Sequence, residues 1–291
     1  MRILLFGATG QVGSDCAEVL MRKSYDLVTI SRADVDFADA KKVAEIVMQY
    51  RPDVVVNACA YTAVDKAETE PLLADQVNHL SVASLASACN TVSALLIHLS
   101  TDYVFDGSAS MPYDESSSVN PLGVYGSTKW LGEQSVIKLA SQYIILRTSW
   151  VFGKNGNNFV KTMLKLAGEH KELSIVSDQV GRPTYVGHIV DVIVTLVERY
   201  DRQAVIPWGI YHCSSLGEVS WHQFAQHIFD LAYRQGRLPQ LPVLSAIASS
   251  SYPTSAPRPM YSVLNTNKLE ALLGRRMPSW GEGLEDLLAK Q

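Results

Sequence analysis

The chain opens with Met1-Arg2-Ile3-Leu4-Leu5-Phe6-Gly7-Ala8-Thr9-Gly10-Gln11-Val12-Gly13, an apolar run that leads directly into a glycine-rich turn. From residue 11 to residue 21 the apolar residues then recur at helical spacing. Glycines let such a turn adopt positive φ and approach a phosphate closely, and the helix N-terminus that follows offers free N–H groups. This strand-turn-helix unit therefore predicts a site for the pyrophosphate of a dinucleotide rather than a turn without a ligand.

Short apolar runs alternate with longer helical patterns through the first half of the chain. The predicted strands are residues 3–6, 27–30, 54–56, 95–99 and 144–146. Strands that are apolar on both faces are typical of a parallel sheet covered by helices on each side. The sequence therefore predicts an α/β protein, with a Rossmann-type doubly wound parallel sheet and a smaller, discontinuous α/β substrate-binding domain.

The regular alternation ends after Trp150, which suggests a second domain. Helical patterns follow at residues 158–169, 189–197, 219–233 and 266–273, and the proline- and serine-rich stretch 239–259 predicts an extended loop. We expect a dinucleotide-binding domain over residues 1–150, with a return of the chain to it around 185–212. Residues 151–291 are expected to form mainly the substrate-binding domain.

Composition restricts the class of partner. The chain is 47% hydrophobic, with a formal charge of -4 and a pI near 6.0. It therefore has material for a large core but no broad positive field to attract nucleic acid or an anionic membrane, so we expect a small-molecule substrate. No export signal or membrane-spanning run is visible, which predicts a cytoplasmic protein. A homodimer is left open.

The cysteines and histidines give no sign of a metal site. The four cysteines lie far apart without a C-x-x-C pair, so neither a zinc site nor a disulfide framework is predicted. No pair of histidines stands at metal-ligand spacing in a plausible site. We interpret His98, His222 and His227 as packing or surface residues.

Two residues after the second predicted strand bear on cofactor choice. An NAD-selective protein usually places a carboxylate there, whereas this chain has Ser31-Arg32. A cation and a hydroxyl suit the 2'-phosphate of NADPH, although Arg32 could also be a solvated surface residue. Asp36 is placed near the adenine and leaves NADH use open, and Phe37 is counted with it among the cofactor-binding residues.

The third predicted strand ends in Asn57-Ala58-Cys59-Ala60-Tyr61-Thr62. Small residues let the chain pass close to a dinucleotide at the carboxyl edge of a sheet. We therefore expect Ala60, Tyr61 and Thr62 to contact the cofactor, while Asn57 either joins them or packs a helix against the strand.

The fourth predicted strand leads into Ser100-Thr101-Asp102, and Tyr125-Gly126-Ser127-Thr128-Lys129 follows two dozen residues later. Residues four apart on a helix share one face, so the Lys129 ammonium can approach the Tyr125 phenol. A nearby cation favours phenolate, which predicts that the tyrosine pKa is pulled below its ordinary value of about 10. The pair is therefore a candidate for proton transfer, and Lys129 can also hold the nicotinamide ribose.

These motifs, in this order, resemble the extended short-chain dehydrogenase/reductase superfamily. Further blocks, spread over nearly the whole chain, resemble its dTDP-4-dehydrorhamnose reductase family. They are Ala63-Val64-Asp65-Lys66-Ala67-Glu68, Ser100 to Gly107, Arg147-Thr148-Ser149-Trp150-Val151-Phe152, Gly156-Asn157-Asn158-Phe159, Asp178 to Thr184 and Arg258-Pro259. The resemblance implies NADPH-dependent reduction of the C4 ketone of a nucleotide sugar, dTDP-6-deoxy-L-lyxo-4-hexulose (dTDP-4-dehydrorhamnose), to dTDP-L-rhamnose.

The resemblance also assigns residues. The implied catalytic residues are Tyr125, as proton donor, with Lys129 and Thr101. The expected cofactor-binding residues are Gly7, Thr9, Gly10, Gln11, Val12, Gly13, Ser31, Arg32, Asp36, Phe37, Ala60, Tyr61, Thr62, Tyr125 and Lys129. The implied substrate-binding residues are Thr101, Asp102, Trp150, Asn158 and Arg258, the last near the diphosphate. Trp150 could instead be a core aromatic, and Asn158 a helix cap.

Two other functions stay open. A nucleotide-sugar epimerase of the same superfamily would reduce and reoxidise a bound NAD in each turnover, but the compact C-terminal half and the block at residues 100–107 argue against it. A non-catalytic regulatory subunit, resembling that of methionine adenosyltransferase, would keep the fold without the chemistry. The intact set of Thr101, Tyr125 and Lys129 argues against that role. The sequence does not decide which 4-keto sugar stereoisomer is preferred.

Overall fold

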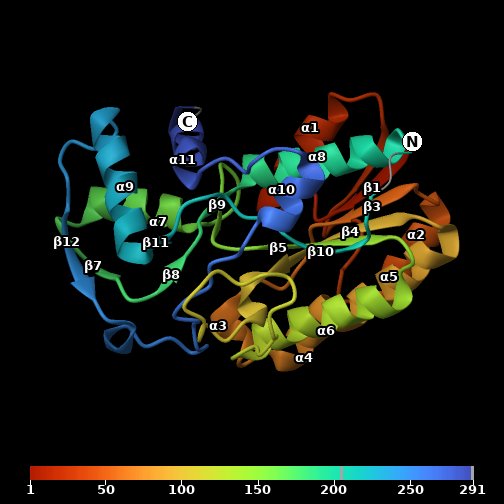
Figure 1. Ribbon diagram of the computed structural model, residues 1–291, viewed down its shortest axis with the longest axis horizontal. Coiled ribbons are helices and arrows are strands. Elements are labelled where there is room, and N and C mark those ends of the chain that lie inside the picture. Colours follow the sequence, from red (N-terminus) through yellow and green to blue (C-terminus); the bar gives the residue numbers. More distant parts are fainter. Residues whose placement is uncertain (204–205, 290–291) are drawn as a thin grey trace.

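The structure is a computed structural model that describes residues 1–203 and 206–289, and its main feature is a six-stranded sheet (Figure 1). All neighbouring strands in it run parallel. From one edge to the other they are β10 (Gly209–His212), β5 (Tyr143–Thr148), β4 (Leu95–Thr101), β3 (Val54–Asn57), β1 (Arg2–Phe6) and β2 (Asp26–Ile30). The predicted fold class is confirmed.

Helices cover both faces of this sheet (Figure 1). One layer contains α1 (Gln11–Met21), α8 (Val186–Asp201) and α10 (Asn267–Leu273). The other contains α2 (Ala40–Tyr50), α5 (Ser81–Val92) and α6 (Val124–Leu139). Residues 3–6 and 54–56 are fully buried because both faces of their strands are covered, which is why these strands read as continuous apolar runs.

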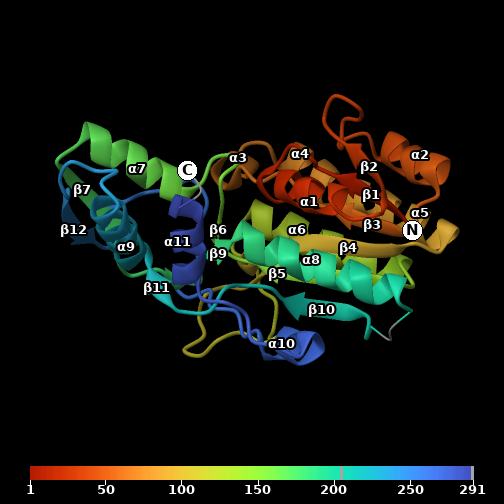
Figure 2. The same ribbon diagram turned by 90° about the horizontal axis from the view of Figure 1, so that it is seen from above.

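The remaining elements form a second lobe and the connections to it. Figure 2 shows α7, α9, α11, β7 and β12 gathered at one end of the molecule, around their own apolar core. The elements of this half are β6 (Val151–Phe152), α7 (Phe159–Glu169), β7 (Glu172–Val176), β8 (Val180–Gly181), β9 (Thr184–Tyr185), β11 (Val219–Ser220), α9 (Trp221–Arg234), β12 (Val243–Ile247), the 3-10 turn η3 (Ser249–Ser251) and α11 (Trp280–Ala289). The connections in the first half are α3 (Val64–Ala67), α4 (Pro71–Asp75), the π-helical turn η1 (Gln76–Leu80) and the 3-10 turn η2 (Asp102–Val104).

Strand β12 corrects one prediction, because it lies inside the stretch 239–259 that the sequence predicts to be an extended loop. It pairs in parallel with β7, in a register that runs from Val243 opposite Glu172 to Ile247 opposite Val176. The strand is mostly exposed and includes a serine and an alanine, so it shows no apolar alternation. Only its distant pairing partner makes it a strand.

Residues 185–212, where the sequence predicts a return of the chain, supply α8 and β10 to the layers of the main sheet. The division into two domains near residue 150 stays a prediction. Among the described residues, no helix is long and apolar enough to span a membrane, and no group of three or more His, Cys, Asp or Glu side chains is placed to hold a metal ion. The cytoplasmic location and the homodimer stay predictions as well.

Candidate active site

A cavity of about 610 Å³ lies at the carboxyl ends of β1, β2 and β3. The strand order changes direction between β1 and β3, and ligands of open α/β sheets bind in the crevice at such a point. Nine predicted cofactor-binding residues line it: Gly7, Thr9, Gly10, Ser31, Arg32, Asp36, Phe37, Ala60 and Tyr61. The other six predicted cofactor-binding residues do not line it: Gln11, Val12, Gly13, Thr62, Tyr125 and Lys129. The lining also includes Ala58 and Cys59, from the predicted segment of small residues, and five residues that sequence reasoning missed: Phe6, Ile30, Val35, Leu73 and Val77.

The glycine turn has the geometry that a pyrophosphate needs. Gly7 has φ of 80°, and a Cβ on it would lie 2.8 Å from the Ala58 carbonyl carbon. A Cβ on Gly13 would lie 2.0 Å from the Gly7 carbonyl oxygen, so this glycine lets α1 pack against the turn. Helix α1 begins after Gly10 without a side-chain cap. Its first N–H groups are therefore available to an anion, and the turn fits a dinucleotide.

Arg32 and Ser31 differ in their availability to a ligand. Arg32 lines the cavity, is exposed, and forms no ion pair among the residues that the structure describes. The Ser31 hydroxyl donates instead to the Asp34 carboxylate at 2.6 Å, and the Ser31 backbone N–H donates to the same oxygen at 2.7 Å. These hydrogen bonds hold the pKa of Asp34 below its ordinary value. Within the part of the chain that the structure describes, the cavity thus offers Arg32 as a free cation, and the Asp34 carboxylate is bonded to its neighbour Ser31.

Helix α6 brings the Tyr125 phenol to the end of β4. The helix begins after Gly123, which is extended, so Tyr125 stands in its first turn. The Tyr125 side chain is hydrogen-bonded to that of Thr101, and the Tyr103 ring meets the Tyr125 ring edge-on with centroids 5.5 Å apart. Burial raises the pKa of Tyr125 above its ordinary value of 10.0, and the Thr101 hydrogen bond lowers it by less.

The predicted effect of Lys129 on Tyr125 is wrong in this structure. Lys129 is 1% exposed, and its Nζ donates to the Leu99 carbonyl oxygen at 2.7 Å. The ammonium is therefore bound to β4 and adds nothing that lowers the Tyr125 pKa, which burial raises. Burial also lowers the pKa of Lys129 itself, to about 8.

A buried ion pair that sequence reasoning missed lies one turn further along α6. Glu133 and Arg147 are 0% and 1% exposed, and the Arg147 guanidinium donates to both carboxylate oxygens of Glu133, at 2.7 to 3.2 Å. The Ser100 hydroxyl donates to Glu133 at 2.5 Å. Glu133 follows Lys129 by four residues, so the helical spacing that picks out the Tyr-Lys pair could also have found it.

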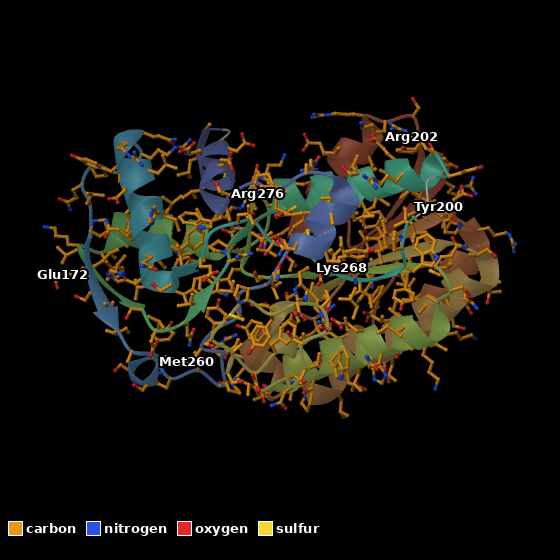
Figure 3. The ribbon with its side chains drawn as sticks, in the orientation of Figure 1. Glu172, Tyr200, Arg202, Met260, Lys268 and Arg276 are labelled. Atoms are coloured by element: carbon orange, nitrogen blue, oxygen red, sulfur yellow. The ribbon has the colours of Figure 1, made fainter. Side chains whose placement is uncertain are left out.

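Asp102 lies close to Tyr125, and Arg258 contacts Tyr103, whose ring meets that of Tyr125. Asp102 is 1% exposed and accepts a hydrogen bond from the Thr101 hydroxyl at 3.2 Å, and burial raises its pKa to about 6. Arg258 donates to the Tyr103 phenol at 2.9 Å and to the Asp65 carboxylate at 2.6 Å. Its loop leads on to Met260, which is labelled in Figure 3. A late loop is thereby tied to the edge of the site.

Trp150 and Asn158 both make structural contacts. The Trp150 ring is stacked on Trp221, with ring centroids 3.4 Å apart, and Gly181 lies against the indole. Asn158 caps α7 by accepting the Lys161 N–H, and its amide also donates to the Gln11 side chain at 3.0 Å. Asn158 therefore links the second lobe to the start of α1.

The doubly wound sheet, the glycine turn and the Tyr-x-x-x-Lys helix define an oxidoreductase of the extended short-chain dehydrogenase/reductase class. A family model described as the RmlD substrate binding domain matches residues 1–291. The chain belongs to the dTDP-4-dehydrorhamnose reductase family, which confirms the family that its motifs predict.

Individual relatives match over their full length. The dTDP-4-dehydrorhamnose reductase of Salmonella typhimurium is 41% identical, over 100% of this chain and 98% of that protein, and that of Aggregatibacter actinomycetemcomitans is 40% identical over 99% and 98%. A crystal structure of the Bacillus anthracis dTDP-4-dehydrorhamnose reductase, in complex with NADP, is 37% identical with a TM-score of 0.91, over 100% of this chain and 99% of that one. A Thermus thermophilus UDP-glucose 4-epimerase, 18% identical with a TM-score of 0.81, shares the fold alone.

Proposed function

We propose that this chain reduces the C4 ketone of dTDP-6-deoxy-L-lyxo-4-hexulose (dTDP-4-dehydrorhamnose) to dTDP-L-rhamnose, with NADPH as reductant and Tyr125 as proton donor. The observation that carries the proposal is the hydrogen-bonded pair of Tyr125 and Thr101 at the same sheet edge as the cavity of the glycine turn. Membership of the reductase family, over the whole chain, supports the substrate.

The chemistry of the pair follows from its surroundings. A bound nicotinamide cofactor would supply the hydride to the carbonyl carbon. Burial raises the Tyr125 pKa, so the phenol holds its proton at neutral pH and is an acid that can protonate the carbonyl oxygen. The Thr101 hydroxyl, which here donates to Asp102, becomes a second donor to the same oxygen when its proton turns toward the substrate. Developing negative charge on that oxygen is therefore met by two donors.

Cofactor preference depends on a balance between Arg32 and Asp34. Arg32 is free to pair with the 2'-phosphate of NADPH, which supports that cofactor, as does the NADP bound by the Bacillus anthracis relative. The Asp34 carboxylate accepts the hydrogen bond of the Ser31 hydroxyl and places a negative charge beside Ser31. We therefore infer that NADPH is preferred through Arg32, with NADH as a weaker substitute.

The remaining proposed roles concern the sugar nucleotide. Asp102 borders Thr101, so we propose that it contacts the sugar. Arg258 is already paired with Asp65, and a substrate diphosphate would compete with that carboxylate for the guanidinium. For Trp150 and Asn158 the visible contacts are a ring stack and a helix cap, so their proposed substrate contacts depend on the resemblance alone.

The test supplies dTDP-6-deoxy-L-lyxo-4-hexulose with NADPH or NADH, follows oxidation of the cofactor, and identifies the sugar. We expect one cofactor oxidised per sugar reduced, and a fall of about 10²–10⁴-fold in Tyr125→Phe, which keeps the ring but cannot donate a proton. Arg32→Ser should raise KM for NADPH and leave KM for NADH unchanged. Sugar conversion without net cofactor oxidation would indicate an epimerase, and undiminished reductase activity in Tyr125→Phe would remove that residue from the mechanism.

A further inference from the structure

A fully buried histidine contacts Lys129 beneath the candidate active site. His98 on β4 is 0% exposed, and its Nε2 lies 3.5 Å from the Lys129 Nζ. Its other ring nitrogen, Nδ1, lies 3.0 Å from the Asn57 amide nitrogen. Asn57 is also fully buried. The mechanism proposed above uses neither residue, yet both are polar groups held in the interior next to a proposed catalytic lysine.

The contacts of Asn57 determine where the histidine carries its proton. The Asn57 side-chain oxygen accepts the Cys59 backbone N–H at 3.0 Å, and a backbone N–H can only donate, so the orientation of this amide is fixed. The amino group therefore faces His98 and donates to Nδ1. Burial and the Lys129 charge hold the pKa of His98 well below 6.5, so the ring is neutral. A neutral ring whose Nδ1 accepts has its proton on Nε2.

The Nε2–H group of His98 therefore points at the Lys129 nitrogen. An ammonium presents only N–H donors, so two donors would face each other at 3.5 Å, whereas a neutral amine has a lone pair that can accept. We propose that His98, held in this tautomer by Asn57, is a positioning residue that shifts Lys129 toward its neutral amine form. The inference rests on the proposed role of Tyr125 and on the catalytic role that the family resemblance implies for Lys129.

Other charges around Lys129 act in both directions. Besides His98, the titratable groups of the described chain that act on it are Glu133 on α6 and Cys59 after β3. Glu133 raises the Lys129 pKa, but Arg147 neutralises most of that carboxylate's charge. Burial raises the pKa of the Cys59 thiol to about 12, so it stays neutral, as does the Tyr125 phenol. His98 is thus the neighbour whose N–H donor disfavours the ammonium form of Lys129.

The proton balance of one turnover is complete with these groups. Tyr125 gives its proton to the substrate oxygen, and a proton from solvent restores the phenol. The neutral amine of Lys129 accepts the His98 Nε2–H, which stabilises the amine relative to the ammonium. His98 itself exchanges no proton and Asn57 only donates to it, so neither is a catalytic residue.

The first test measures the tautomer in the intact protein by ¹⁵N NMR of the histidine rings, with His98→Gln used to assign the signals. We expect an unprotonated Nδ1 and a protonated Nε2 in the wild type at neutral pH. A ring protonated on Nδ1, or on both nitrogens, would overturn the inference. This measurement needs no substrate, so it is independent of whether the chain is a reductase.

The second test reverses the tautomer. Asn57→Asp replaces the amino group by an acceptor, so His98 should place its proton on Nδ1 and accept from the ammonium through Nε2. We expect the apparent pKa of the alkaline limb of the pH–rate profile to rise by at least about half a pH unit. This corresponds to a decrease of about threefold in the acid dissociation constant of Lys129. The control Asn78→Asp adds a carboxylate at another buried amide, which contacts the Tyr61 backbone and the Thr128 hydroxyl rather than His98.

The outcomes separate the two proposals. If Asn57→Asp changes neither the tautomer of His98 nor the alkaline limb of the pH–rate profile, the role of His98 is overturned. An equal shift of that limb in Asn78→Asp also overturns it, because the effect would then come from the added charge alone. If Asn57→Asp does not fold, the wild-type spectrum still decides the tautomer. The expected tautomer in a protein without reductase activity would refute the proposed function and leave the hydrogen-bonding assignment intact.

Discussion

Asp102→Asn should stabilise the protein at alkaline pH, although it removes a charged group. Asp102 is 1% exposed, and its Oδ2 has no hydrogen-bond partner among the described residues. Burial raises its pKa from 3.8 to about 6. Because the folded-state pKa is the higher one, the carboxyl contributes stability below pH 3.8 and this contribution is lost as the pH rises through about 6.

The size of the effect follows from that shift. A rise of about two pKa units corresponds to about 3 kcal/mol lost by the wild type between acid and alkaline pH, and asparagine cannot ionise, so it avoids this loss. The new amide nitrogen would replace Oδ2 without a partner, which costs about 1 kcal/mol. We therefore expect a net gain of about 2 kcal/mol at pH 8 and, because only the cost remains there, a net loss of up to about 1 kcal/mol at pH 4.

The assay is urea unfolding of Asp102→Asn and the wild type, followed by circular dichroism at both pH values. The control is Asp106→Asn. Hydrogen bonds from Ser108 and Asn120 lower the Asp106 pKa to about 2, so its folded-state pKa is the lower one and this variant should lose stability at pH 8. A gain for Asp102→Asn that is no larger at pH 8 than at pH 4 would refute the reasoning.

Two further predictions concern packing and buried charge. Gly13→Ala places a Cβ 2.0 Å from a backbone carbonyl oxygen, so its melting temperature and cofactor affinity should both fall. Gly168→Ala, in α7 with nothing within 4 Å, should gain about 0.5–1 kcal/mol, and equal melting curves would contradict this account. Glu133→Gln leaves the Arg147 charge buried and should lose about 3–5 kcal/mol in urea unfolding. Arg22→Gln, in an exposed ion pair, should lose less than about 1 kcal/mol, and a loss as large as that of Glu133→Gln would argue against a special role for burial.

Local patterns in the sequence predicted five of the six strands of the main sheet, all but β10, because these strands carry their own signal. A strand covered on both faces must be apolar throughout, and a glycine turn before a helix marks the first crossover. Strand β12 carries no such signal, since one serine and one alanine occupy a strand of five residues that is mostly exposed. Its pairing with β7 depends on contacts between residues far apart in the chain.

The candidate site divides in the same way. Tyr125, Lys129 and the glycines could be found because their function requires fixed local spacing, on one helix or in one turn. Leu73 and Val77 line the cavity, but nothing in their own segment links them to the strand ends.

By itself, the sequence determined the order of the first five strands, the family, and the residue types present at the sheet edge. The tertiary structure decided the state of those residues. Local spacing placed Lys129 beside Tyr125, but folding bound its ammonium to the Leu99 carbonyl and placed His98 against it. Protonation depends on burial and on partners from other strands, and those exist only once the chain has folded.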